Sequence, residues 1–408
     1  MTDSWLETPE RTGFGLENLP FGVVVHGRSA PQPAVAIGSS ALGLGSATEA
    51  GLFDGVLSEP ELLTEPSLDR LLAAGPAVWR AVRRRVAELL STRTYVNAVR
   101  PLLLPLDSVA NPLPFAVADY VDFYSSRHHA ENLGRIFRPD GQALLPNWTH
   151  LPIGYHGRAG TVVVSGTPIH RPHGQRLPAP GAEPVFGPTI RLDIEAEVGF
   201  VVGVPTRLGQ SVSVDEFTEH VFGAVLVNDW SARDIQAWEY QPLGPFLGKS
   251  FATSVSPWIV PLDALAEARV APPHQDPAPL PHLLGDHWGY DLTLQVDLNG
   301  TTVSRPPFAG LYWTPAQQLA HLTSNGARLR TGDLFASGTV SGPEAGQRGS
   351  LIELTWNGAE PLHLADGSTR TFLADGDTVV LSATAPGRNG TRIGFGTVTG
   401  TIQSGQSR

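Results

Sequence analysis

Two glutamates at alternate positions of the segment IRLDIEAEVGF could bind a cation. Small or apolar residues alternate there with polar residues, and the polar ones include Glu195 and Glu197. The alternation predicts a β-strand with both glutamates on one face, about 7 Å apart, so that their carboxylates could share one ion. A solvated strand face explains the same alternation and is the simpler interpretation of this segment alone.

A polar cluster follows the apolar run VLV in the segment VLVNDWSARDIQAWEY. It begins with Asp229, at the predicted end of a strand, where functional side chains often gather. If the following residues form a helix, Arg233 and Gln236 lie three positions apart on one face, and both side chains can donate hydrogen bonds on the same side of the helix. A helix with a charged outer surface is the simpler interpretation when the segment is taken alone.

Lys249 is the only lysine among the 28 basic residues of the chain. Its ammonium group can lose a proton, which a guanidinium does not do. This single lysine is therefore kept either for a chemical role or by chance, and both interpretations are open. The triplet Gly248-Lys249-Ser250 is similar to a phosphate-binding loop, but only three residues separate it from Gly244, where that motif requires four. Nucleotide binding is therefore not expected, and the lysine lies in a glycine-rich backbone that a ligand could approach closely.

The segment VDFYSSRHHAENLGRIFRPD combines several groups that could act on a substrate. Ser125 or Ser126 can cap a helix that carries His128 and His129 in its first turns. Neighbouring helical residues point about 100° apart, so at most one of the two histidines can face a given site. Histidine suits the role of a general base near neutral pH, although a single histidine on a helix is more often structural.

The composition limits both the fold and the partners. Glycine and proline number 44 and 36 of 408 residues, which favours short strands joined by turns, and we expect a mainly β fold. The net charge of -11 argues against nucleic-acid or membrane binding. Without cysteine, metal ligands are limited to oxygen and imidazole. The acidic N-terminus and the lack of a long apolar run predict a cytoplasmic protein.

Two domains are predicted. Short apolar runs in residues 1–57 are typical of a small barrel-like module. From Pro76, apolar residues at three- and four-residue spacing predict a helix whose exposed face carries Arg80, Arg83, Arg84 and Arg85. The proline-rich stretch 100–114 is expected to break regular structure and to mark a junction. We place the boundary near residue 115, between an N-terminal domain of residues 1–115 and a C-terminal domain of residues 116–408.

The C-terminal part is predicted to consist mainly of strands. Period-two alternation begins at Thr161, Ile190, Asp291 and Ser350. The Asn-Gly pairs at 299–300 and 357–358 predict hairpin turns. Two shorter helices are predicted, one at Ser213 with Glu216 in a capping box, and one that opens at Thr314-Pro315.

Four long strings resemble the fumarylacetoacetase family: DFYSSRHHA, LPNWTHLPIGYHGRAGTVVVSGTPI, NDWSARDIQAWEYQPLGPFLGKSFATSVSPW and DLFASGTVSGPE. The likeness runs from about Asn18 to about Gly396. It implies a mainly β (α+β) fold, with an N-terminal SH3-like barrel domain followed by a C-terminal β-roll catalytic domain, and a homodimer.

The resemblance implies that Asp122, Glu195, Glu197 and Asp229 bind Mg²⁺ or Ca²⁺. Four carboxylates in one pocket would repel one another without a divalent cation, and hard oxygen ligands select magnesium or calcium. By the same resemblance His129 is the general base, although the His128-His129 doublet leaves this assignment ambiguous, and Glu353, in the predicted strand LIELTW, orients it.

The remaining implied roles concern the substrate. Arg233, Gln236 and Lys249 match the donors that stabilise the oxyanion and the leaving carbanion, and Lys249 could also give a proton to the departing carbon. The implied substrate-binding residues are Tyr124, Arg138, Tyr155, Tyr240 and Thr339. Without the resemblance, aromatic packing and a surface ion pair would explain the tyrosines and Arg138.

The implied activity is metal-dependent hydrolysis of a carbon–carbon bond in 4-fumarylacetoacetate, a small dicarboxylate diketone, to fumarate and acetoacetate. This reaction is the last step of tyrosine and phenylalanine breakdown. The alternatives are a related acylpyruvate hydrolase, a hydratase of unsaturated oxo-acids, and a non-catalytic metal-binding β-protein. Loss of the diketone absorbance on mixing with protein and Mg²⁺ would distinguish an enzyme from the last of these.

Overall fold

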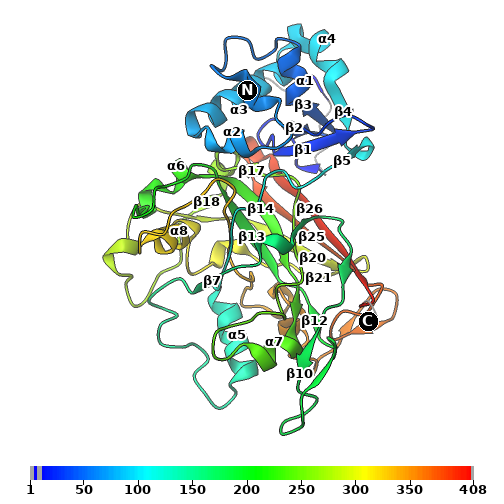
Figure 1. Cartoon of the computed structure of the whole chain (residues 1–408), viewed down its shortest axis with the longest axis vertical. Coiled ribbons are helices and arrows are strands. Elements are labelled where there is room, and N and C mark those ends of the chain that lie inside the picture. Colours follow the sequence, from blue (N-terminus) through cyan, green and yellow to red (C-terminus); the bar gives the residue numbers. More distant parts are fainter. Residues whose placement is uncertain (1–3, 7–11, 406–408) are drawn as a thin grey trace.

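The computed structural model describes residues 4–6 and 12–405 and consists of a small N-terminal domain on a larger C-terminal one. Figure 1 shows the N-terminal domain, in blue and cyan, seated on one end of the long strands of the C-terminal domain. Most regular structure in the C-terminal domain is β-strand, so the predicted mainly β, two-domain fold is confirmed. Within the described residues, no helix combines the length and apolarity needed to span a lipid bilayer.

The N-terminal domain is built on a curled five-stranded sheet with the order β4-β3-β2-β1-β5. Its strands are β1 (Phe21–His26), β2 (Gln32–Ile37), β3 (Ser40–Gly43), β4 (Leu103–Pro105) and β5 (Val109–Ala110). The two edge strands come from the proline-rich stretch that was expected to break regular structure, and that expectation is wrong. Proline is compatible with an edge strand because one side of such a strand needs no backbone donor.

Helices cover this sheet, and the longest of them is α3 (Pro76–Ser91). Its buried residues are the predicted apolar stripe: Trp79, Val82, Val86, Leu89 and Leu90. Shorter helices lie beside it, namely α1 (Leu44–Glu49), α2 (Asp69–Ala73) and α4 (Val96–Val99).

The arginines of α3 are only partly a solvated face. Arg80 and Arg84 are exposed. Arg83 and Arg85 are half-buried instead, and they donate to the backbone carbonyls of Glu17 and Leu52. The prediction of a uniformly exposed cluster is wrong for these two because a long aliphatic stem lets an arginine reach polar backbone across an apolar surface.

The C-terminal domain contains an eight-stranded sheet with the order β7-β6-β22-β13-β14-β16-β8, and β17 pairs with β14 beside this path. The bounds are β6 (Tyr120–Phe123), β7 (Gly154–His156), β8 (Val162–Val164), β13 (Ala196–Val202), β14 (Val221–Asp229), β16 (Thr253–Val255), β17 (Val260–Pro261) and β22 (Leu334–Ala336). Strands far apart in sequence therefore become neighbours, since β6 and β13 both flank β22.

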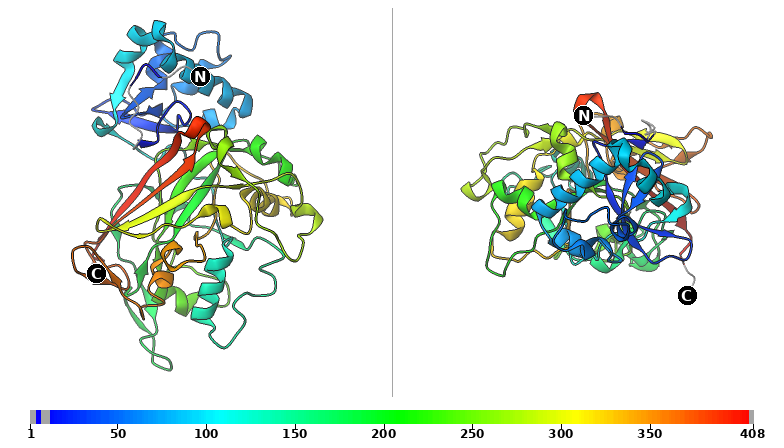
Figure 2. Two further views of the ribbon diagram at one scale, coloured as in Figure 1. Left: turned by 180° about the vertical axis from the view of Figure 1, so that it is seen from behind. Right: turned by 90° about the horizontal axis from the view of Figure 1, so that it is seen from above.

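A second sheet has five strands in the order β21-β20-β25-β26-β9. They are β9 (Ile169–His170), β20 (Thr293–Leu298), β21 (Thr301–Ser304), β25 (Thr378–Pro386) and β26 (Arg392–Gln403). Figure 2 shows β25 and β26 as long strands that run along the edge of the domain. The predicted Asn299-Gly300 hairpin joins β20 to β21, and both residues have the positive φ that such a turn requires.

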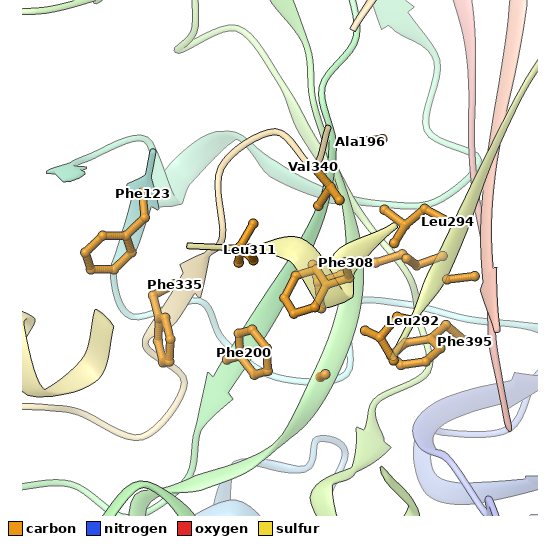
Figure 3. Packing of buried hydrophobic residues seen from close by; sticks show 14 of the residues in the cluster. Phe123, Ala196, Phe200, Leu292, Leu294, Phe308, Leu311, Phe335, Val340 and Phe395 are labelled. Atoms are coloured by element: carbon orange, nitrogen blue, oxygen red, sulfur yellow. The ribbon is translucent and has the colours of Figure 1, made fainter. Parts of the chain in front are cut away.

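The strand β13 is buried on both faces, whereas its sequence alternates as for a half-exposed strand. Phe200 stacks on Phe335 with ring centroids 5.5 Å apart and lies 6.3 Å from Phe308, and Figure 3 shows these rings together in the core. The other face also lacks solvent, because Glu197 is fully buried. The interpretation of this segment as a solvated strand face is therefore wrong.

The prediction of a strand that begins at Ser350 is also wrong, because Leu351–Leu354 form a short helix, α9. The carboxylate of Asp193 accepts hydrogen bonds from the backbone N–H groups of Leu351 and Ile352, which stabilises the first turn. Two other predicted helices are confirmed, since Ser213 and Glu216 form a capping box and α8 (Pro315–Thr323) begins after Thr314. The helix predicted after Trp230 is α7 (Arg233–Glu239).

Candidate active site

Four carboxylates from three strands meet in the interior of the C-terminal domain. Asp122 lies on β6, Glu195 directly precedes β13, Glu197 lies on β13, and Asp229 ends β14. Each offers one oxygen, and these four oxygens lie within 4.8 Å of one another. The pairing of β13 with β14, and of β22 with both β13 and β6, brings these strands side by side. All four predicted metal ligands are thus brought together.

The electrostatics of this cluster fit a bound cation. Burial, reinforced by the charge of Asp229, raises the pKa of Asp122 to about 7. Burial and the charge of Asp122 likewise raise the pKa of Glu197 well above its usual value. Oδ1 of Asp122 and Oε1 of Glu197 are buried and have no hydrogen-bond partner among the described residues. The cluster thus has two carboxylate oxygens without a described partner, and the carboxyl groups that carry them ionise less readily than usual because of burial and charge repulsion. Both features suit the binding of a hard divalent cation.

Basic side chains neutralise the other two carboxylates of the cluster, those of Glu195 and Asp229. Lys249 donates to Glu195 and also to Asp229, where the Nζ to Oδ2 distance is 2.8 Å. Burial alone would raise the pKa of Asp229, but the cations of Arg158 and Lys249 outweigh it and leave that pKa lowered. Burial would lower the pKa of Lys249, but the two carboxylates raise it, so this lysine is charged at neutral pH.

His129 is held by a buried carboxylate beside the cluster. Its Nδ1 lies 2.7 Å from Oε2 of Glu353, and both side chains are almost completely buried. The helix α5 (Arg127–Phe137) begins after its N-cap Ser126, as predicted, and places His129 on the inner face. His128 is half-buried and does not line the cavity described below. The geometry therefore favours His129 over its neighbour as the histidine of the site.

Glu353 is positioned by several donors besides the imidazole. Asn132 donates to its Oε1, and Ser341 and Ser350 donate to its Oε2. Burial tends to raise the pKa of Glu353, but the charge of His129 and these hydrogen bonds outweigh it and lower that pKa. Glu353 is therefore a carboxylate at neutral pH and fixes Nδ1 of His129 as the protonated nitrogen, which leaves Nε2 free to act on a ligand.

A cavity of about 320 Å³ connects the carboxylate cluster with the imidazole. All five predicted substrate-binding residues line it: Tyr124, Arg138, Tyr155, Tyr240 and Thr339. Asp122, His129, Glu195, Arg233, Gln236 and Lys249 also line it. Oγ1 of Thr339 is buried without a hydrogen-bond partner among the described residues, and so is Nε of Arg138. The remaining predicted residues, Glu197, Asp229 and Glu353, lie behind this lining.

The predicted donor pair on α7 is present. Nη1 of Arg233 donates to Oε1 of Gln236 at 3.1 Å, and it also lies 2.7 Å from Oε1 of Glu195. Nε of Arg233 donates to Asp193, a buried carboxylate. The guanidinium is therefore fixed in direction at the edge of the cavity, as a preorganised donor must be.

A larger groove of about 760 Å³ lies elsewhere, between the N-terminal domain and the five-stranded sheet of the C-terminal domain. Its lining includes Asn111, Trp258, Arg305 and Arg392. Among the described residues that line it, none is an aspartate, glutamate, histidine or lysine. Of these two cavities, the smaller is the candidate active site because its lining combines carboxylates with an imidazole and the lining of the larger groove does not.

Sequence reasoning missed three buried residues that shape the site. Arg158 bonds both Asp122 and Asp229, Asp193 holds Arg233, and Asn132 holds Glu353. Asp193 lies in the same alternating run as the two predicted glutamates, which was a usable signal. Arg158 lies within one of the strings that resemble the family, but no spacing or alternation pattern indicated that it belongs to the carboxylate cluster.

The fold and the site together define a two-domain, mainly β protein in which a buried cluster of four carboxylates, able to hold a divalent cation, lies next to a carboxylate-oriented histidine. Residues 17–114 match the family model described as fumarylacetoacetase N-terminal, and residues 119–403 match that of the fumarylacetoacetate (FAA) hydrolase C-terminal. The chain belongs to the fumarylacetoacetate hydrolase family.

Relatives of similar length carry the same family name. The chain is 46% identical to a fumarylacetoacetase of Arabidopsis thaliana and 46% identical to one of Homo sapiens, in both cases with 98% of each chain covered. Among solved structures, a fumarylacetoacetate hydrolase from psychrophilic Exiguobacterium antarcticum is similar in fold, with a TM-score of 0.54 and 16% identity. That match covers 95% of this chain and 99% of the other.

Proposed function

We propose that this protein hydrolyses 4-fumarylacetoacetate to fumarate and acetoacetate, the last step of tyrosine and phenylalanine breakdown. The observation that carries the proposal is the meeting of four buried carboxylates and the His129–Glu353 pair around one cavity. The full-length relatives named fumarylacetoacetase support the choice of substrate.

The reaction begins with the activation of water by His129. Nε2 of the imidazole takes a proton from a water molecule, and Glu353 stabilises the imidazolium through its bond to Nδ1. The hydroxide adds to the substrate carbonyl beside the double bond. The donors Arg233, Gln236 and Lys249 lie along the cavity where they can stabilise the resulting oxyanion.

Collapse of this tetrahedral intermediate breaks the carbon–carbon bond. The bonding electrons leave with the acetoacetate fragment, and the carboxyl group of fumarate forms at the carbon that accepted the hydroxide. The departing carbon takes up a proton, and the proposed donor is Lys249, a charged group that lines the cavity. A divalent cation held by Asp122, Glu195, Glu197 and Asp229 would supply Lewis-acid stabilisation of substrate oxygens.

The identity of the cation, the assembly and the location belong to the same proposal. We infer Mg²⁺ or Ca²⁺ because all four ligand side chains offer hard carboxylate oxygens. We further propose a cytoplasmic homodimer, and a domain boundary near residue 115, which falls between β5 and β6.

The proposal is tested by mixing purified protein, Mg²⁺ or Ca²⁺, and 4-fumarylacetoacetate, and following the diketone absorbance. Fumarate and acetoacetate should appear in equal amounts as the absorbance falls. A panel of 2,4-diketo acids in the same assay distinguishes an acylpyruvate hydrolase, which would prefer the shorter substrates. Absence of turnover with every diketone and both cations would refute the proposed activity.

Replacing Glu353 with glutamine should lower kcat about 10²-fold with little change in cation binding. The amide keeps the volume but loses the charge that fixes the tautomer of His129 and stabilises its protonated form. The matched control is Glu360→Gln, an exposed glutamate seven residues away that should leave kcat unchanged. Equal kcat values for the Glu353 variant and the parent would contradict the assignment.

Arg138→Lys should raise KM for the dicarboxylate substrate about tenfold and change kcat much less. Arg138 lines the cavity, and among the described residues its guanidinium has one hydrogen-bond partner, the backbone carbonyl of Ala143, to which Nη2 donates at 3.0 Å. A lysine cannot form the two parallel hydrogen bonds that an arginine forms with a carboxylate. Arg135→Lys, on the exposed side of the helix α5 that ends just before Arg138, is the control, and an unchanged KM for the Arg138 variant would exclude substrate binding there.

A further inference from the structure

Arg158 lies inside the carboxylate cluster although it cannot be a metal ligand. Its side chain is only 6% exposed. Nη1 donates to both carboxylate oxygens of Asp229, at 2.8 and 2.9 Å, and Nη2 donates to Oδ2 of Asp122 at 3.1 Å. One guanidinium therefore links a carboxylate of β6 to one of β14. It leaves Oδ1 of Asp122 unbonded among the described residues.

The surroundings of Arg158 fix its position. The guanidinium carbon lies 5.0 Å from the ring centroids of both Tyr120 and Tyr155. The Tyr155 hydroxyl donates to the same oxygen of Asp122 that Arg158 bonds. The backbone of Arg158 has a φ of 75°, which residues with a Cβ adopt rarely, and it follows Gly157 with a φ of 122°. The chain thus takes an unfavourable local conformation that brings this cation into the cluster.

Counting the charges around the cluster shows what Arg158 contributes. Five buried carboxylates are counted, namely the four clustered ones and Asp193, which pairs with Arg233 beside the cluster: Asp122, Asp193, Glu195, Glu197 and Asp229. Three buried cations, Arg158, Arg233 and Lys249, form ion pairs with four of these carboxylates, and Glu197 has no ion pair among the described residues. With all groups ionised, five negative and three positive charges leave a net charge of minus two. One divalent cation would neutralise this charge, and buried charge is tolerated only when it is compensated.

We infer that Arg158 is a built-in counter-ion that sets the charge of the cation site at minus two and so makes it selective for divalent over trivalent ions. This inference rests on the cation site of the proposed function but not on the reaction. Without the charge of Arg158 the cluster would carry minus three, and a trivalent ion would gain more from this change than a divalent ion would.

The test compares the dissociation constants of Ca²⁺ and Tb³⁺ for the metal-stripped, full-length protein. Terbium binding is followed by its luminescence, excited through the neighbouring tyrosines, and calcium binding by competition. In Arg158→Gln, which keeps polar donors but not the charge, the selectivity for Tb³⁺ over Ca²⁺ should rise about tenfold. In the matched variant Arg158→Lys, which keeps the charge, the selectivity should stay within about threefold of that of the parent.

An Arg158→Gln variant with unchanged selectivity would overturn the inference, and so would an equal shift in the lysine variant. If Arg158→Gln does not fold, Asp193→Asn tests the same charge count by removing one negative charge instead of one positive charge. Asp193 is not one of the four clustered ligands, and its neutralisation should lower the preference for Tb³⁺. A rise or no change there overturns the inference.

The outcome is separable from that of the proposed activity. If the protein does not turn over any diketone but its variants show the expected selectivity shifts, the proposed enzymatic activity is refuted and the counter-ion role of Arg158 is supported. A parent protein that binds neither ion would refute the counter-ion role together with the cation site.

Discussion

Replacing His129 with alanine should lower kcat about 10³-fold, because the variant lacks the base that takes the proton from water. The imidazole is the group that the structure places between the buried carboxylate of Glu353 and the cavity. The change also leaves Glu353 without one of its four partners in a buried position, so we expect a loss of about 2 kcal/mol in the free energy of unfolding. Steady-state kinetics and urea unfolding measure the two effects.

His128→Ala is the matched control for this prediction. His128 is the preceding residue on the same helix, and it does not line the cavity. Its removal should change kcat less than about twofold. If the two variants lost activity equally, or if His128→Ala alone lost it, the assignment of the base would be wrong. Cation binding should remain in both variants, since neither histidine belongs to the group of four carboxylates.

Removal of the cation with a chelator should lower kcat/KM about 10³-fold, and Mg²⁺ or Ca²⁺ should restore it. The reason is that the four clustered carboxylates would then lack the ion that binds and polarises the substrate oxygens. The same treatment should lower Tm, because a ligand that binds only the folded state stabilises it by mass action. Undiminished turnover after complete removal of divalent ions would contradict the role of the cluster.

The size of this stabilisation should depend on pH. In the metal-free protein, burial first and then the charge of Asp229 raise the pKa of Asp122 from 3.8 to about 7. The folded metal-free protein therefore keeps this proton up to about pH 7, whereas the unfolded chain releases it near 3.8, so its stability falls as the pH rises through this window. Because the cation replaces the proton, the Tm difference between the cation-loaded and the chelated protein should grow from pH 4.5 to 7.5. A constant difference would contradict a raised pKa in the cluster.

Local sequence determined those features that depend on a few neighbouring residues. The helix α3 follows from apolar spacing, the turn at Asn299-Gly300 from residues that accept a positive φ, and the start of α5 from the cap at Ser126. The two-residue spacing of Glu195 and Glu197 already indicated that their carboxylates could share an ion. Long strings of matching residues indicated the family, and with it the identities of the clustered acids and of His129.

Tertiary structure alone decided which of these side chains are buried and what they contact. The run around Glu197 has the alternation of a half-exposed strand, yet both of its faces are buried because elements distant in sequence cover them. Glu353 was expected on a strand but lies on α9, whose first turn is stabilised by Asp193 from 158 residues earlier in the chain. Arg158 enters the cluster through contacts with β6 and β14. Burial and charge pairing depend on distances between remote segments, and a local pattern contains no information about those distances.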